Sequence, residues 1–235
     1  MEAPHRKSPR LKGYDYSQPG AYFVTICTRE RACILGEIVD GKMKPSAVGM
    51  IVVSCWEEIP RHFASTRLST YQMMPNHVHG IVEITGRRTR ENSVGTRHAV
   101  SLQGPEGEGF GKPRQGSLST IIRSFKSAAT KLIHNEGQYP KQTPWQPRFF
   151  DHIIRSNIDQ FFIQQYIELN PLLWQLDTDN NAVCEPPVDD LRRTLRERYG
   201  LQESAVAYLI DCELSYRTWQ QYRAACNAGR EKVAS

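Results

Sequence analysis

The sequence lacks the signals that mark a membrane-spanning, secreted or zinc-knuckle protein. No stretch of its 235 residues approaches the roughly 20 uninterrupted apolar residues that a membrane span needs. The opening residues, MEAPHRKSPRLKG, lack the apolar run of a secretory signal, so we expect a cytoplasmic protein. The six cysteines include no CxxC pair, which argues against a metal knuckle or a dithiol redox site. We therefore expect buried or idle thiols and no disulfide framework.

The composition also excludes a fibrous or wholly disordered chain, because it has only 16 glycines and 14 prolines. Hydrophobic residues make up 39% and charged residues 23%, which are the proportions of an ordinary soluble protein. The length allows one domain with an appendage, or two small domains. No P-loop of the form GxxxxGK[ST] is present, so the sequence carries no sign of nucleotide-driven chemistry.

Positive charge is concentrated in the first three quarters of the chain. The formal net charge is +5, from 30 Lys and Arg against 25 Asp and Glu. Residues 177–235 hold 8 of the basic and 10 of the acidic residues, so the preceding part carries a net charge of +7. Such an excess suits a polyanionic partner, because bound cationic side chains release the counterions of a phosphate backbone. By itself it is weak evidence for nucleic acid.

Hydrophobic periodicity predicts a succession of strands and helices. Residues 21–28 and the runs 68–74 and 78–84 are strand-like, and the last two would lie side by side around Pro75-Asn76. Asp40-Gly41 signals a hairpin. Helices are predicted at residues 47–62, 118–135, 157–169, 188–199 and 203–228, and a short strand within WQPRFFDHIIR. Between two of these elements, residues 86–116 are rich in glycine and basic residues and predict a mobile loop.

This order predicts an α+β fold with a ferredoxin-like, mainly antiparallel sheet and helices packed on one face. In particular, we expect the helices at 117–135 and 157–169 to share that face. Residues 1–174 would form the main domain, and residues 175–235 a helical C-terminal extension of unknown role.

The sharpest local feature is the run Pro75-Asn76-His77-Val78-His79. Two histidines two apart on a strand point to the same face, so both imidazoles can reach one divalent ion. Two ligands make only half of a metal site. An isolated HxH pair is also explained by polar residues on the solvent side of an edge strand.

A second feature lies at the predicted end of the 157–169 helix, where Tyr166 and Asn170 are four residues apart and share a helix face. Taken alone, they are equally a packed tyrosine and a helix-terminal asparagine before proline. Together with a metal-binding histidine pair, a tyrosine hydroxyl could attack a phosphodiester whose phosphate a cation polarises. Tyr14, Tyr16 and Tyr139 lie next to a basic arm or a proline, where we expect mobile backbone that would hold an attacking oxygen poorly.

Four ordered blocks, GAYFVTICT, MPNHVHGIV, WQPRFFDHIIR and YIELNPLLW, resemble those of the REP-associated tyrosine transposases, within the HUH class of single-strand DNA nucleases. The resemblance extends from about Tyr14 to Trp174. It implies that His77 and His79 are metal ligands, that Tyr166 is the nucleophile and that Asn170 is a third, polar ligand. The long 86–116 segment and residues 175–235 depart from the family pattern.

The resemblance further implies a ferredoxin-like fold, Mg²⁺ or Mn²⁺ as cofactor, and association with the nucleoid. Its substrates would be single-stranded DNA hairpins of repetitive palindromes, cut through a 5′-phosphotyrosine. The target sequence, the genomic role and the choice between monomer and homodimer stay open. So do two other functions, a binding protein that recognises hairpins without cutting them and a metal-dependent phosphodiesterase that uses activated water.

A substrate of this kind would be held through its phosphates by basic side chains, with unpaired bases stacked on aromatic rings. Each basic residue taken singly is also explained as a solvated surface charge. The candidate contacts are Arg10, Lys12, Arg123, Lys126, Lys131, Arg148 and Arg155.

Overall fold

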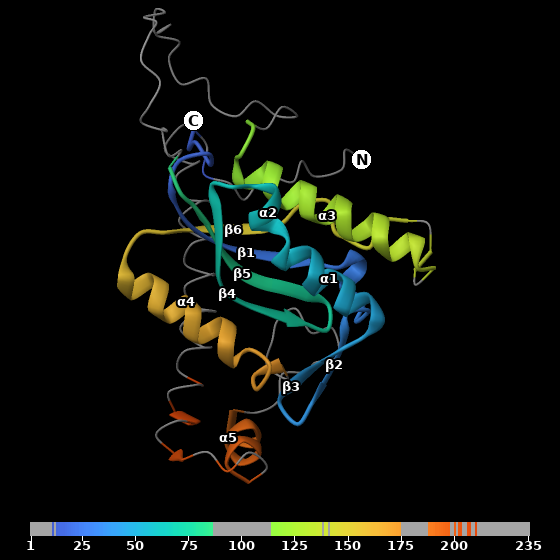
Figure 1. Ribbon diagram of the computed structural model, residues 1–235. Helices are drawn as coiled ribbons and strands as arrows, with labels where there is room; N and C mark the ends of the chain where they lie inside the picture. The colour runs from blue at the N-terminus through green and yellow to red at the C-terminus, as the bar shows by residue number, and fades with distance from the viewer. Residues whose placement is uncertain are drawn as a thin grey trace, which may run out of the picture.

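The structure is a computed structural model that describes residues 13–86 and 114–174 except positions 138 and 141, residue 11, and parts of 188–210. Its main sheet is antiparallel throughout, in the order β4-β5-β1-β6 (Figure 1). The strands are β1 (Gly20–Cys27), β4 (Thr66–Met74), β5 (His77–Ile84) and β6 (Phe150–Ile154). Strand β1 therefore lies between β5 and β6, the last two of the four strands along the chain, as in a ferredoxin-like sheet. The predicted α+β fold with an antiparallel sheet is confirmed.

A small second sheet and a short helix precede the first long helix. Strands β2 (Gly36–Val39) and β3 (Lys42–Pro45) form the predicted hairpin, in which Asp40 and Gly41 both have positive φ angles, 51° and 70°. Positive φ at both turn positions matches the twist of the paired strands. The 3₁₀ helix η1 (Arg29–Arg31) follows β1.

Three helices lie on one face of the main sheet. They are α1 (Ala47–Glu57), α2 (Ile59–His62) and α3 (Leu118–Asn135). Each of the helices α1 and α3 is capped by a serine hydroxyl at its start. Ser46 accepts a hydrogen bond from the backbone N–H of Gly49, and Ser117 accepts one from that of Thr120. Their apolar stripes bury Trp56 and Phe125 against Tyr22, Val24 and Val82, which point to this side of the sheet.

Helix α4 (Asn157–Leu169) lies on the opposite face, which corrects the expectation that it would share a face with α3 (Figure 1). Its buried residues Ile163, Tyr166 and Ile167 pack on Phe23 and Ile81, which alternate along their strands with the side chains that face α1 and α3. The physical reason is that β1 and β5 are apolar on both faces, so each face needs a helix to cover it.

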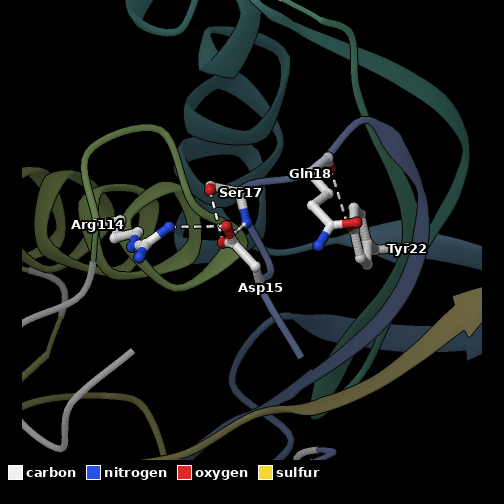
Figure 2. Close-up of polar contacts among 5 residues, drawn as sticks. All are labelled: Asp15, Ser17, Gln18, Tyr22 and Arg114. Carbon is white, nitrogen blue, oxygen red and sulfur yellow. Dashed lines mark hydrogen bonds and ion pairs between the residues drawn. The ribbon is translucent and has the colours of Figure 1, made fainter. Parts of the chain in front are cut away.

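The segment before β1 is packed as well, which corrects the expectation of a mobile backbone at Tyr14 and Tyr16. Their rings contact each other and Tyr22, and Tyr16 is only 2% exposed. Figure 2 shows the polar contacts that hold this segment: Asp15 accepts a bond from Arg114 at 2.8 Å, and Tyr22 donates to the Gln18 carbonyl at 2.8 Å. Burial, followed by the hydrogen bond with Tyr14, raises the pKa of Tyr22.

Several predictions concern residues that lie outside the described part of the chain. These are residues 87–113 of the predicted loop, most of the predicted 203–228 helix, and three of the six cysteines. Of the described cysteines, Cys55 is buried, Cys27 is half-buried and Cys33 is exposed, and no disulfide joins them. Helix α5 (Val188–Glu197) agrees with the predicted 188–199 helix, and its Leu195 packs with Leu173 and Ile210. Among the described residues, no helix is both long and apolar enough to cross a membrane.

Candidate active site

Strand β5 presents His77 and His79 on the face that α4 covers. Their partners across the sheet are Cys27 and Thr25 of β1, and the two imidazole centroids lie 4.2 Å apart. Val78 and Gly80 point to the opposite face, against α1 and its Trp56. The alternation of the strand therefore brings both rings together as the sequence predicts.

Each histidine is held by a hydrogen bond at its Nδ1 atom. His77 Nδ1 lies 2.8 Å from Asn76 Oδ1, and His79 Nδ1 lies 3.0 Å from Thr25 Oγ1. Phe23 stacks on the His79 ring, with the centroids 5.4 Å apart. In both residues Nε2 is then the ring nitrogen on the other side from this bond, and in His79 it lies 3.3 Å from the Tyr166 hydroxyl.

Both histidines are buried, at 0% and 2% exposure, and this sets their charge. Burial lowers the pKa of His79 to about 3. Burial, together with the charges of His79 and Arg31, lowers the pKa of His77 well below its usual value of 6.5. The two imidazoles are therefore neutral near pH 7, which is the form that binds a metal ion.

Helix α4 brings Tyr166 to the histidines. The helix begins at Ser156, whose hydroxyl accepts the backbone N–H of Asp159 at 3.1 Å, and Asp159 also bonds His152 of β6 at 2.8 Å. From this anchored start the helix crosses the sheet, so that the Tyr166 hydroxyl lies 3.3 Å from His79 Nε2. Tyr166 is 6% exposed, and its ring centroid is 5.1 Å from that of His79.

Asn170 closes the helix one turn after Tyr166 and is 1% exposed. Its Oδ1 atom has no hydrogen-bond partner in the described part of the structure, which is costly for a buried amide oxygen. Trp174, just beyond, faces His77 with ring centroids 6.1 Å apart. Among the described residues, no group of three His, Cys, Asp or Glu side chains could hold a metal ion.

The described tyrosines lie on two opposite faces of the main sheet. Tyr14, Tyr16, Tyr22, Tyr71 and Tyr139 all belong to the core on the α1 and α3 side. Among the described tyrosines, Tyr166 alone packs in the cluster on the histidine face. The structure thus supplies a stronger reason for choosing Tyr166 than backbone mobility does.

The predicted DNA-binding residues are not gathered into one patch. Arg123 and Lys131 are exposed on α3, across the sheet from the histidines, whereas Arg155 is exposed at the start of α4. Arg148 is exposed before β6, and Arg10 and Lys12 lie outside the described residues.

Lys126 points inward, in contrast to the expectation of a DNA contact. Its ammonium group donates to the carbonyl oxygens of Gln146 at 2.8 Å and Arg148 at 2.9 Å, and burial lowers its pKa to about 8. These two hydrogen bonds tie α3 to the segment before β6, and they satisfy the ammonium group of this half-buried side chain.

Sequence reasoning missed the residues that support the site: Thr25, Asn76 and the pair His152–Asp159. Thr25, Asn76 and His152 each lie within a matched block, and Asn76 stands directly before His77, whereas Asp159 lies outside the blocks. Thr25 becomes relevant only through the pairing of β1 with β5.

The fold and the site define a ferredoxin-like α+β protein with a buried pair of histidines and a tyrosine on a covering helix. The chain is 34% identical over 173 residues to an uncharacterized protein of Haemophilus influenzae, covering 74% of this chain and 92% of that protein. At this identity and coverage, the chain belongs to the family of that protein. No family model matches the chain.

Two solved structures resemble the chain more distantly. One is a REP-associated tyrosine transposase bound to a REP hairpin, with a TM-score of 0.43 and 20% identity over 73% of each chain. The other, from Deinococcus radiodurans R1, has a TM-score of 0.38 and 18% identity over 68% of this chain and 96% of that chain. At such identities and TM-scores these two structures carry no functional argument for this chain, and the proposed function rests on its own side chains.

Proposed function

We propose that this chain is a transposase-like endonuclease that cuts and rejoins hairpin-forming single-stranded DNA through Tyr166. The observation that carries the proposal is the 3.3 Å contact between the Tyr166 hydroxyl and His79 Nε2, beside the second buried histidine. Residues 87 positions apart in the sequence meet at this point, and they are the residues that the family resemblance singles out. A purely binding protein has no chemical need for a tyrosine hydroxyl and two neutral imidazoles together.

The residues present fit a divalent metal ion of the Mg²⁺ or Mn²⁺ type. His77 and His79 are neutral and aligned on one face, and the buried Oδ1 of Asn170 lacks a hydrogen bond within the described structure. These three residues would hold the ion. When bound, it would polarise the phosphate and stabilise the charge on the leaving oxygen.

The reaction itself is a transesterification by Tyr166. Its oxygen attacks a DNA phosphorus in line, the bond to the 3′ oxygen breaks, and a 5′-phosphotyrosine forms. The leaving 3′ oxygen takes up a proton in place of the one that the phenol loses. Rejoining is the same step reversed, and it needs no external energy source because the covalent link conserves the phosphodiester.

Tyr166 is covered in this structure, and this constrains the reaction. With 6% of the side chain exposed, a phosphate reaches the hydroxyl only when α4 or the turn at 170–174 moves aside. Helix α4 is held at its first turn by Ser156 and Asp159 and further along by the packing of Ile163 and Ile167 on the sheet, so such a movement has to break part of that packing.

The proposal is tested by incubating the full chain with Mn²⁺ and a single-stranded hairpin that is labelled at its 3′ end, and separating the products under denaturing conditions. The label has to be at the 3′ end because the fragment with the 5′ phosphate is the one that becomes joined to Tyr166. A labelled protein band that survives denaturant is the expected result. Cleavage without such an adduct would favour the phosphodiesterase that uses activated water. Binding with neither cleavage nor adduct would favour the non-cleaving hairpin binder, and either outcome would overturn the proposal.

A further inference from the structure

We propose that Asn76 is a positioning residue that fixes His77 as the tautomer with its proton on Nδ1, which keeps the Nε2 lone pair available for a metal ion. The inference rests on the proposed function, since it assigns how that same metal site is prepared. Its basis is the 2.8 Å contact between Asn76 Oδ1 and His77 Nδ1, in which Asn76 is 1% exposed.

The direction of this hydrogen bond follows from the other end of the Asn76 amide. Its Nδ2 atom donates to the carbonyl oxygen of Arg31 at 3.1 Å. Reversing the amide would place two carbonyl oxygens against each other at that position. The oxygen facing His77 is therefore Oδ1, which has no proton to donate, so His77 Nδ1 must be the donor.

The backbone of Asn76 is anchored too, which keeps the amide in register with the ring. Its carbonyl oxygen accepts bonds from the Thr28 backbone N–H at 2.8 Å and the Thr28 hydroxyl at 3.0 Å. Thr28 is fully buried at the end of β1. The turn between β4 and β5 is thus tied to the central strand immediately before the first histidine.

His79 differs in this respect. Its Nδ1 atom contacts the Thr25 hydroxyl, which can either donate or accept, so that partner does not dictate a tautomer. Asn76 dictates one. For metal-bound histidines, replacing the group that orients the ring typically weakens metal affinity by about 10- to 100-fold.

The first test is the tautomer itself, measured in metal-free full-length protein with ¹⁵N-labelled histidine by long-range ¹H–¹⁵N correlation spectra at pH 7. A His77→Gln spectrum assigns the signals among the seven histidines. The expected result is a protonated Nδ1 and an unprotonated Nε2. A protonated Nε2 would overturn the inference whether or not the protein cleaves DNA.

The second test measures Mn²⁺ affinity by electron paramagnetic resonance in the wild type, Asn76→Leu, Asn76→Asp and Thr28→Val. We expect a loss of about 10- to 100-fold in Asn76→Leu. Asn76→Asp keeps an acceptor for Nδ1–H but places an oxygen against the Arg31 carbonyl, so it should recover part of the affinity. Thr28→Val removes the hydroxyl that anchors the Asn76 backbone but leaves the Asn76 side chain in place, so Mn²⁺ affinity should stay within about threefold of the wild type. A loss in Thr28→Val equal to that in Asn76→Leu would show that Asn76 has a merely structural role.

The two proposals fail in different ways. If wild-type protein binds no Mn²⁺, the metal-dependent function fails, while the tautomer assignment is judged by the spectra alone. If the wild type binds Mn²⁺ and Asn76→Leu binds it equally well, the positioning role fails and the function stands.

Discussion

At the scale of single residues, the proposed chemistry depends on the hydroxyl of Tyr166. Tyr166 meets His79 through its oxygen, whereas its ring packs against Phe23 and is part of the apolar cluster under α4. The chemical and the packing contributions of this side chain can therefore be separated by removing the oxygen alone.

We expect Tyr166→Phe to abolish cleavage and the covalent adduct while the protein stays folded and binds hairpin DNA. Loss of one hydrogen bond should change the free energy of unfolding by no more than about 1 to 2 kcal/mol. The measurement is adduct formation on a labelled hairpin, with circular dichroism and a binding titration as controls. An adduct that persists in Tyr166→Phe would show that another residue is the nucleophile.

The buried histidines also predict how stability depends on pH in the presence of a chelator. Burial lowers the pKa of His79 to about 3, while an unfolded histidine titrates near 6.5. Below pH 6.5 the unfolded chain takes up a proton that the folded chain excludes, so stability is lost as the pH falls. From pH 7 to pH 5, His79 should contribute a loss of about 2 kcal/mol.

Urea unfolding of the wild type, His79→Gln and His62→Gln at pH 7 and pH 5 checks this expectation. His79→Gln should be less sensitive to acid than the wild type. His62 is exposed, and replacing it should leave the sensitivity unchanged. Equal acid sensitivity in all three proteins would mean that His79 takes up its proton in the folded state.

At the scale of elements, β5 and α1 approach each other closely at Gly80. A Cβ atom there would lie 2.4 Å from Cζ2 and 3.0 Å from Cη2 of Trp56. The Trp56 ring is fully buried and contacts Phe125 and Tyr71, with centroids 5.4 Å and 6.0 Å away, so it has little room to move. Glycine is needed here for the helix to lie close against the strand that carries the histidines.

Gly80→Ala should therefore lower the free energy of unfolding by about 1 to 3 kcal/mol or more, through overpacking. Gly20→Ala in β1 is the matched control, because its nearest contacts are Tyr22 atoms at 3.6 Å or more. The control should be neutral or slightly stabilising, since alanine loses less backbone entropy than glycine. Urea midpoints that fall equally in both variants would contradict the close contact.

At the scale of the whole molecule, the positive charge before residue 177 should make DNA binding dependent on salt. Hairpin affinity should fall linearly on a double logarithmic plot against salt concentration, with a slope of about −0.7 for each single-strand phosphate neutralised. Arg155 is exposed and adjoins the helix that carries Tyr166. Arg155→Gln, which removes one such contact, should reduce the magnitude of the slope by about 0.7.

The control for this measurement is Arg61→Gln, because Arg61 on α2 already pairs with Glu58 at 2.7 Å. Its slope should equal that of the wild type in fluorescence anisotropy titrations. Affinity that is independent of salt in the wild type would rule out an interface dominated by phosphate contacts.

By itself, the sequence determined the elements and much of the candidate site. Alternating and helical periodicities place β1, β5, α3 and α4 within a residue or two, since these patterns are local. The same alternation places His77 and His79 on one face. Local patterns show which side of an element is buried, but not which element buries it.

Only the tertiary structure decided that α4 covers the face opposite α3, that Lys126 turns inward and that Tyr14 and Tyr16 are packed. Each of these depends on a partner distant in sequence, and no local pattern records such a partner. The contact between Tyr166 and His79 is of the same kind, because a helix and a strand far apart along the chain have to pack before the two atoms meet. Burial then sets the charge of the histidines, and burial is a property of the packed molecule.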